Sequence, residues 1–277
     1  DYKLLDSSEA FQTLLGSGTL SGDQSVGNQT LGIQDGNFPG SIEDSGSSAT
    51  QLIKTGTGTL ILSGANTYEG GTTISGGTLQ IGNGGATGIV AGDIINNSEL
   101  MFDRSGDYFY NGSVSGTGNF TLNRGILRLS AAQTYTGTTR IQNNSILVLP
   151  FIDQSLSSGM SVDIEDGSVL DISNSLLTIS QLTGMGTVNS FGGTDGNLTL
   201  NVATGSSTFG GILGSSPAGI HPNFSLTKAG AGTQILTGAN NYTGTTAINA
   251  GTLLVNGSLG NGAVTVNNGG TLGGSGS

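Results

Sequence analysis

The chain has 277 residues, of which only 9% are charged, and 18 acidic residues against seven basic ones give a net charge of −11. The basic residues are scattered and offer no surface for displacing phosphate counterions, which excludes nucleic acid as a partner. Glycine supplies 51 residues without a three-residue period, which excludes collagen, and 34% hydrophobic residues exclude simple disorder. There is no cysteine for disulfides or thiolate metal sites, and no apolar stretch reaches the length of a membrane span.

The first predicted element is a short helix near the amino terminus. Asp6 and Glu9 have the spacing of a capping box, and the apolar residues Phe11, Leu14 and Leu15 form one stripe at helical spacing. Such a helix would cover the unpaired backbone at the start of a repetitive fold, and a frayed terminus is the alternative. We therefore divide the chain into amino-terminal coils with a capping helix over 1–50 and a main repetitive region over 51–277.

Three similar copies dominate the rest of the chain. They lie near residues 52–81, 119–148 and 226–255. The first and third are identical at more than half of their positions, and the diverged middle copy keeps LRLSAAQTYTGTTRI, which makes Tyr135 equivalent to Tyr68 and Tyr242. Within each copy, aliphatic residues alternate with small polar ones between turns rich in glycine and asparagine. This period of two predicts short strands with one buried face.

The spacing of the copies distinguishes between the possible all-β architectures. The equivalent tyrosines lie 67 and 107 residues apart, and both intervals are multiples of about 22 residues, a reasonable circumference for a three-sided coil. A propeller requires evenly spaced blades, which these copies do not provide. We therefore predict an all-β parallel β-helix of roughly 12 coils, about 60 Å long, with aliphatic residues stacked inside.

The blocks GTGTLILSGANTYEGGTTISGGTLQIG and KAGAGTQILTGANNYTGTTAINAGTLLVNGS carry a family resemblance. They resemble the passenger-associated repeats of Gram-negative autotransporters. The resemblance implies a right-handed β-helical passenger that is secreted to the extracellular side of the bacterial surface, with an amino-terminal signal and a carboxyl-terminal barrel outside this sequence. The repeat marks a stretch associated with secretion and folding and defines no ligand.

Candidate contact residues therefore come from departures from the repeat. The segment 101–112 concentrates aromatic residues beside charged ones, and we predict a partner contact through Arg104, Asp107 and Tyr108, with aromatic packing inside the solenoid as the alternative. Alternation along this segment buries either Phe109 or its two tyrosine neighbours. His221, the only histidine, lies in a proline-containing insertion and is the fourth candidate contact, with an ordinary exposed loop histidine as the alternative.

Catalytic, cofactor and metal sites are not predicted. The segment VDIEDGSVLDIS clusters Asp163, Glu165, Asp166 and Asp171, but the carboxylates alternate with aliphatic residues, as on the solvated side of ordinary strands. No GxGxxG loop is present, and residues 192–197 lack the repeating calcium-binding nonapeptide. The locally basic middle copy, with Arg124, Arg128 and Arg140, is interpreted as a solvated face.

The sequence favours a non-enzymatic passenger segment that acts as an adhesin or a rigid stalk. Its expected partners are a host surface or matrix molecule, or identical passengers bound through weak multivalent contacts. Two alternatives remain open. A polysaccharide-active enzyme would use Asp163, Glu165 and Asp171, whereas a toxin or signalling passenger would act through insertions near Tyr108 and His221.

Overall fold

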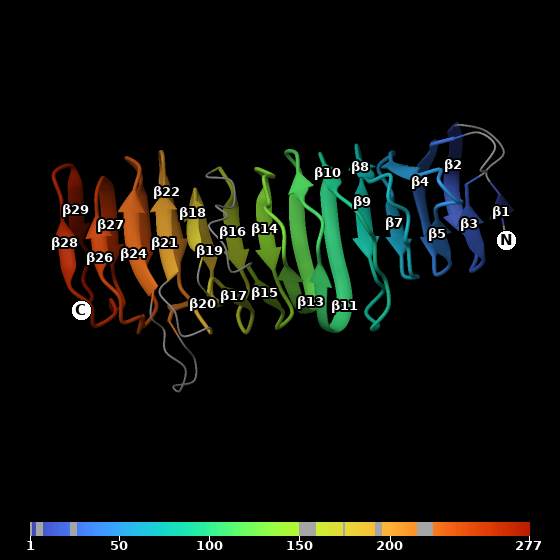
Figure 1. Ribbon diagram of the computed structural model, residues 1–277. Helices are drawn as coiled ribbons and strands as arrows, with labels where there is room; N and C mark the ends of the chain where they lie inside the picture. The colour runs from blue at the N-terminus through green and yellow to red at the C-terminus, as the bar shows by residue number, and fades with distance from the viewer. Residues whose placement is uncertain are drawn as a thin grey trace.

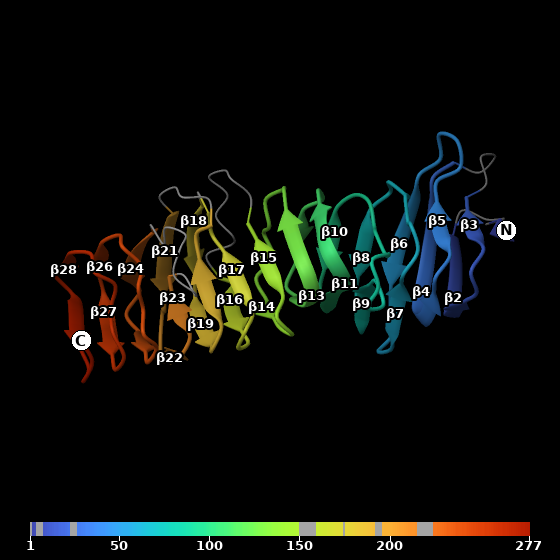
Figure 2. The ribbon, with the colours of Figure 1, turned by 90° about the horizontal axis from the view of Figure 1, so that it is seen from below.

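The computed structural model describes residues 2–3, 8–22, 27–149, 159–173, 175–191, 196–214 and 224–277. Within these ranges every regular element is a β-strand, and the strands pair in parallel. Figures 1 and 2 show the strands stacked along one axis, with the two termini at opposite ends of a rod. The predicted fold is confirmed: the chain forms a right-handed parallel β-helix of about eleven turns, close to the twelve expected.

The strands lie on three faces of the coil, and strands of successive turns form parallel ladders along the rod. The first face consists of β2 (Ser8–Leu15), β4 (Gln29–Phe38), β6 (Thr50–Lys54), β8 (Thr72–Ile74), β10 (Ile94–Asn96) and β12 (Val114–Ser115), and farther along of β18 (Leu176–Ile179), β21 (Gly196–Asn201), β24 (Phe224–Ala229), β26 (Thr246–Ile248) and β28 (Val264–Val266).

The second face is one long ladder that starts from the ends of β2 and β4 and continues through β7 (Thr59–Leu62), β9 (Thr78–Ile81), β11 (Glu99–Tyr110), β13 (Asn119–Leu129), β14 (Thr138–Ile141), β16 (Ser161–Ile164), β19 (Gln181–Gly184), β22 (Ser206–Phe209), β25 (Thr233–Leu236), β27 (Gly251–Val255) and β29 (Gly270–Gly273). The third face consists of β1 (Tyr2–Lys3), β3 (Thr19–Ser21) and β5 (Ser41–Glu43), then the second halves of β11 and β13, β15 (Ile146–Val148), β17 (Val169–Asp171), β20 (Thr187–Asn189) and β23 (Ile212–Leu213).

One repeat copy is longer than one turn and therefore pairs with itself. In the first copy β6 pairs with β8, with Leu52 opposite Thr72, and β7 pairs with β9. The third copy repeats this arrangement, with Leu226 opposite Thr246 and β25 paired with β27. In the middle copy β13 pairs with both β14 and β15. Each copy thus contains both partners of the backbone hydrogen bonds that join two successive turns.

The alternation seen in the sequence separates the interior from the surface. Strand β7 alternates exposed or half-buried residues with buried Leu60 and Leu62, and β9 buries Leu79 and Ile81 in the same way. These inward positions join one continuous apolar core along the rod. Burial of this stripe in every turn provides the main stabilisation of the fold, because the favourable free energy scales with the apolar area removed from water.

The glycines recur where one turn crosses closely over the next. A Cβ added to Gly64 would collide with the carbonyl oxygen of Gly40, and one added to Gly238 would collide with the carbonyl oxygen of Gly211. Turns of parallel strands lie about 4.8 Å apart, which leaves no room for a side chain directed along the axis. The high glycine content therefore follows from stacking at the corners of the coil.

The amino-terminal helix predicted from the sequence is wrong. Residues Ser8–Leu15 form strand β2, which pairs in parallel with β4, while Asp6 lies outside the described residues. Glu9 lies opposite Leu31 and Phe11 opposite Ile33 in the strand register. The helical spacing of the apolar residues was overridden because a strand here can form a parallel backbone ladder with the next turn.

Candidate functional site

Several of the larger side chains shared by the repeat copies point into the solenoid. Tyr68, Tyr135 and Tyr242 are buried, and each hydroxyl forms a hydrogen bond with a threonine four residues later, at 2.7, 2.5 and 2.5 Å respectively. Burial raises the pKa of all three phenols above the ordinary value. The recurring tyrosines therefore hold the interior together and are not available to a partner.

Two lysines at equivalent positions of the first and third copies are also buried. Lys54 and Lys228 have no exposed surface. The Lys54 Nζ donates hydrogen bonds to the carbonyl oxygens of Thr55 at 2.5 Å, Gly56 at 3.3 Å and Gly76 at 2.9 Å, the last of which belongs to the next turn. Burial lowers the pKa of both lysines. These lysines crosslink successive turns and add no positive charge to the surface.

A buried side-chain amide completes the internal part of each copy. Asn66 accepts a hydrogen bond from the Ile42 backbone N–H at 3.0 Å and donates to the carbonyl oxygens of Gly64 and Ile89, so it connects three turns. Asn240 and Gln133 occupy the corresponding positions in the third and middle copies and make the same kind of bonds. Any binding function must therefore lie in side chains outside these internal positions.

The aromatic segment of β11 divides between the interior and the surface. Tyr108 and Tyr110 are buried, and Tyr110 donates from its hydroxyl to the carbonyl oxygen of Gly92 at 2.8 Å. Phe109 points outward and keeps 68% of its surface exposed. The buried Tyr108 hydroxyl has no hydrogen-bond partner, and burial raises its pKa although the nearby Arg104 charge acts in the opposite direction. Of the three aromatic residues, Phe109 is the one presented to solvent.

Three of the four arginines pair with a carboxylate in a neighbouring turn. The Arg128 guanidinium donates to both carboxylate oxygens of Asp107, with distances of 2.9 and 3.1 Å from Nε and 2.9 Å from Nη2. The other two arginine–aspartate contacts, at 3.2 and 3.4 Å, join Arg124 to Asp103 and Arg140 to Asp163. The locally basic middle copy is thus neutralised by acidic residues of adjacent turns.

Arg104 has a different environment. Its Nη1 donates to the carbonyl oxygen of Gly88 at 2.7 Å and its Nη2 to that of Ala86 at 2.8 Å, while its Nε is buried without a partner. The guanidinium carbon lies 4.2 Å from the centroid of the Tyr108 ring. Among the described residues, Arg104 is the one arginine that forms no ion pair with a carboxylate. It is a fixed cation whose charge is compensated only by carbonyl dipoles and an aromatic face.

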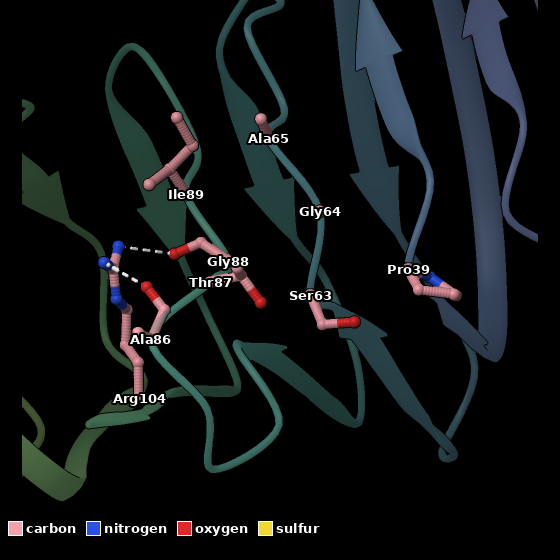
Figure 3. A pocket seen from close by; sticks show the side chains of 9 residues that line it. All are labelled: Pro39, Ser63, Gly64, Ala65, Ala86, Thr87, Gly88, Ile89 and Arg104. Atoms are coloured by element: carbon pink, nitrogen blue, oxygen red, sulfur yellow. Dashed lines mark hydrogen bonds between the residues drawn. The ribbon is translucent and has the colours of Figure 1, made fainter.

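A groove of about 380 Å³ lies beside this cation. We call it the Arg104 groove; it is lined by Pro39, residues 63–65, residues 86–89 and Arg104. Figure 3 shows Pro39 and Arg104 at opposite ends, with the two short segments between them. Ile89 keeps 43% of its surface exposed, and Ser63 and Thr87 supply hydroxyl groups. No acidic residue lines the groove, although acidic residues outnumber basic ones in the chain.

The carboxylates considered for glycan hydrolysis make contacts within the solenoid. Asp163 accepts from Thr183 Oγ1 at 2.9 Å and faces Arg140, and Glu165 accepts from the Asn143 backbone N–H at 3.4 Å. Buried Asp171 accepts from the backbone N–H and hydroxyl of Ser173 and from the Phe191 N–H. In the described part of the chain no group of three acidic or histidine residues could hold a metal ion. His221 and the insertion 215–223 lie outside the described residues.

Comparison with known families identifies the repeat. The passenger-associated-transport-repeat model matches residues 52–81, 114–143 and 226–255. The chain therefore carries three passenger-associated transport repeats, the repeat of autotransporter passengers. A search of curated proteins and a search of solved structures found no match. No helix in the described part of the chain is long and apolar enough to cross a membrane.

The boundaries of two passenger repeats coincide with those predicted, and the middle match begins five residues before the predicted start at Asn119. The bonded pair of Tyr135 and Thr139 matches the pairs in the flanking repeats and supports the predicted equivalence of the tyrosines.

The buried lysines of the passenger repeats were missed by the sequence reasoning, although a signal was present. Lys54 follows Leu52 by two residues, which places both on the same, inward side of β6. The Arg104 groove had no comparable signal, because its lining comes from four successive turns.

Proposed function

We propose that this passenger segment is an adhesive rod at the bacterial surface, which binds a host surface or matrix molecule through its outward-facing side chains. The proposal rests on one observation: the tyrosine, lysine and amide side chains that the repeats share are directed inward, whereas the exposed Phe109, the Asp107–Arg128 pair and Arg104 lie outside those shared positions. The repeats then serve the scaffold and the departures from them serve recognition. Binding residues commonly occupy irregular positions on a rigid framework.

Adhesion is favoured over self-association by charge. A net charge of −11 opposes the approach of identical rods, and the three arginine–aspartate pairs leave few exposed cations to offset it. Analytical ultracentrifugation distinguishes the two versions. A monomer at high protein concentration is expected, and concentration-dependent dimers at physiological salt would support self-association instead.

The adhesive function is tested with beads that carry the purified segment. Coated beads are expected to bind cultured epithelial cells or an array of matrix proteins above the level of beads coated with an unrelated acidic protein of equal charge. A Phe109→Ala, Arg128→Ala double variant removes exposed groups without touching the buried residues of the repeats, and it serves as a first map of the contact surface. Failure of the parent beads to bind any cell or matrix protein contradicts the adhesive function and favours a stalk.

A further inference from the structure

We propose that the Arg104 groove binds a carboxylate-bearing oligosaccharide that lies along the axis of the rod. This inference rests on the proposed adhesive function and names the chemical class of its ligand. The groove crosses four turns from Pro39 to Arg104, which at one strand spacing per turn corresponds to about 14 Å. Its shape therefore suits an extended ligand that contacts several turns at once.

The charge of the groove identifies the ionic part of the ligand. Arg104 is the sole charged residue in the lining, and no carboxylate competes for it. Two of its five N–H donors are used by carbonyl oxygens, and both carbonyl contacts hold the guanidinium plane in place. A planar guanidinium that retains donors matches the two oxygens of a carboxylate. The molecule has a net charge of −11, but the lining of this groove contains no acidic residue that would repel an anionic ligand from Arg104.

The remaining lining identifies the neutral part of the ligand. Its middle consists of the small residues Gly64, Ala65, Ala86 and Gly88, and Gly64 cannot carry a side chain because of the carbonyl of the preceding turn. The lining is thus shallow and held in place by backbone stacking. The hydroxyls of Ser63 and Thr87 suit the hydroxyl groups of a sugar, and Pro39 and Ile89 supply apolar contact for its C–H faces.

Isothermal titration calorimetry with trigalacturonate tests the proposal, and its methyl ester serves as the uncharged analogue. We expect trigalacturonate to bind the parent segment, and the ester to bind at least 10-fold more weakly. Arg104→Gln removes the cation, and Ala65→Leu fills the exposed middle of the groove while keeping every Arg104 bond. Both substitutions should weaken binding at least 10-fold. Arg140→Gln is the matched control, because it removes the same charge from a surface arginine outside the groove, and it should leave binding unchanged.

Three results of the calorimetry and one of a competition experiment would overturn the proposal. The calorimetric results are an absence of trigalacturonate binding, equal binding of the ester, or equal binding by the Arg104→Gln variant. Competition by inorganic sulfate at the same concentration as trigalacturonate would also overturn it, since the site would then accept any anion. The bead assay separates this inference from the adhesive function. Beads that bind cells equally with and without Arg104 refute the groove while adhesion stands, and trigalacturonate binding without cell binding refutes adhesion while the groove stands.

Discussion

Replacing Lys228 by methionine tests whether the buried lysines stabilise the passenger repeat. The Lys228 Nζ donates to the carbonyl oxygens of Ala229 at 2.5 Å, Gly230 at 2.8 Å and Ala250 at 3.3 Å. Methionine has a similar length and fills the same space, but it leaves these three acceptors without their donor. A buried acceptor that loses its partner costs about 1–3 kcal/mol.

The net loss is smaller than three such penalties. In the wild-type protein, transfer of the lysine ammonium from water to the interior costs several kcal/mol, and this desolvation penalty is absent with methionine. We therefore expect Lys228→Met to lower the free energy of unfolding by about 2–4 kcal/mol.

Urea unfolding followed by far-ultraviolet circular dichroism measures this difference, and amide hydrogen exchange locates it. Exchange should accelerate most for amides of β24, β26 and the turns that join them, because the lost bonds bridge these turns. Arg140→Met is the control, since it removes one charge from an exposed pair and should cost at most about 1 kcal/mol. A Lys228→Met protein as stable as the parent would refute the view that the ammonium crosslinks successive turns.

Three further predictions concern the glycines, the tyrosines and the surface charges. Gly238→Ala should cost at least about 1–3 kcal/mol in urea unfolding because its Cβ meets the Gly211 carbonyl, whereas Gly85→Ala, where a Cβ meets nothing within 4 Å, should stay within about 0.5 kcal/mol; equal effects would contradict the stacking argument. Stability should fall as the pH rises above about 10, because the buried tyrosines keep a raised pKa when folded and ionise near 10 when unfolded; absorbance at 295 nm should rise together with unfolding, and tyrosine ionisation in the folded protein near pH 10 would contradict this. Arg128→Gln should cost only about 0.2–1 kcal/mol, measured in the same way, because its pair with Asp107 is exposed; a loss of several kcal/mol would show that the pair is structurally central.

The internal repeats made much of the fold predictable. A period of two within short segments determines which side chains face inward, and the spacing of Tyr68, Tyr135 and Tyr242 determines a coil of nearly constant length. Both are local properties that recur in successive turns. They can therefore be predicted from the sequence without knowing which distant residues are in contact. The inward direction of Lys54 follows from the same alternation, because Leu52 precedes it by two residues.

The predicted amino-terminal helix failed for the opposite reason. Residues 8–15 alone carry a helical apolar spacing, and only the neighbouring strand β4 offers the backbone partners that make this segment a strand. The secondary structure of such a short segment is determined by its hydrogen bonds to another turn and not by the spacing of its own apolar residues.

The sequence by itself determined that this protein winds into a parallel β-helix and carries passenger-associated transport repeats, because a repeated pattern encodes repeated stacking. Only the tertiary structure decided which surface groups meet. Arg104, unlike the other arginines, forms no pair with an aspartate in the described part of the chain and donates to carbonyl oxygens of the preceding turn. The groove beside it is lined by residues of four turns, from Pro39 to Arg104. Sites formed across turns depend on the register between turns, and register is fixed by packing and backbone bonding between segments distant in sequence.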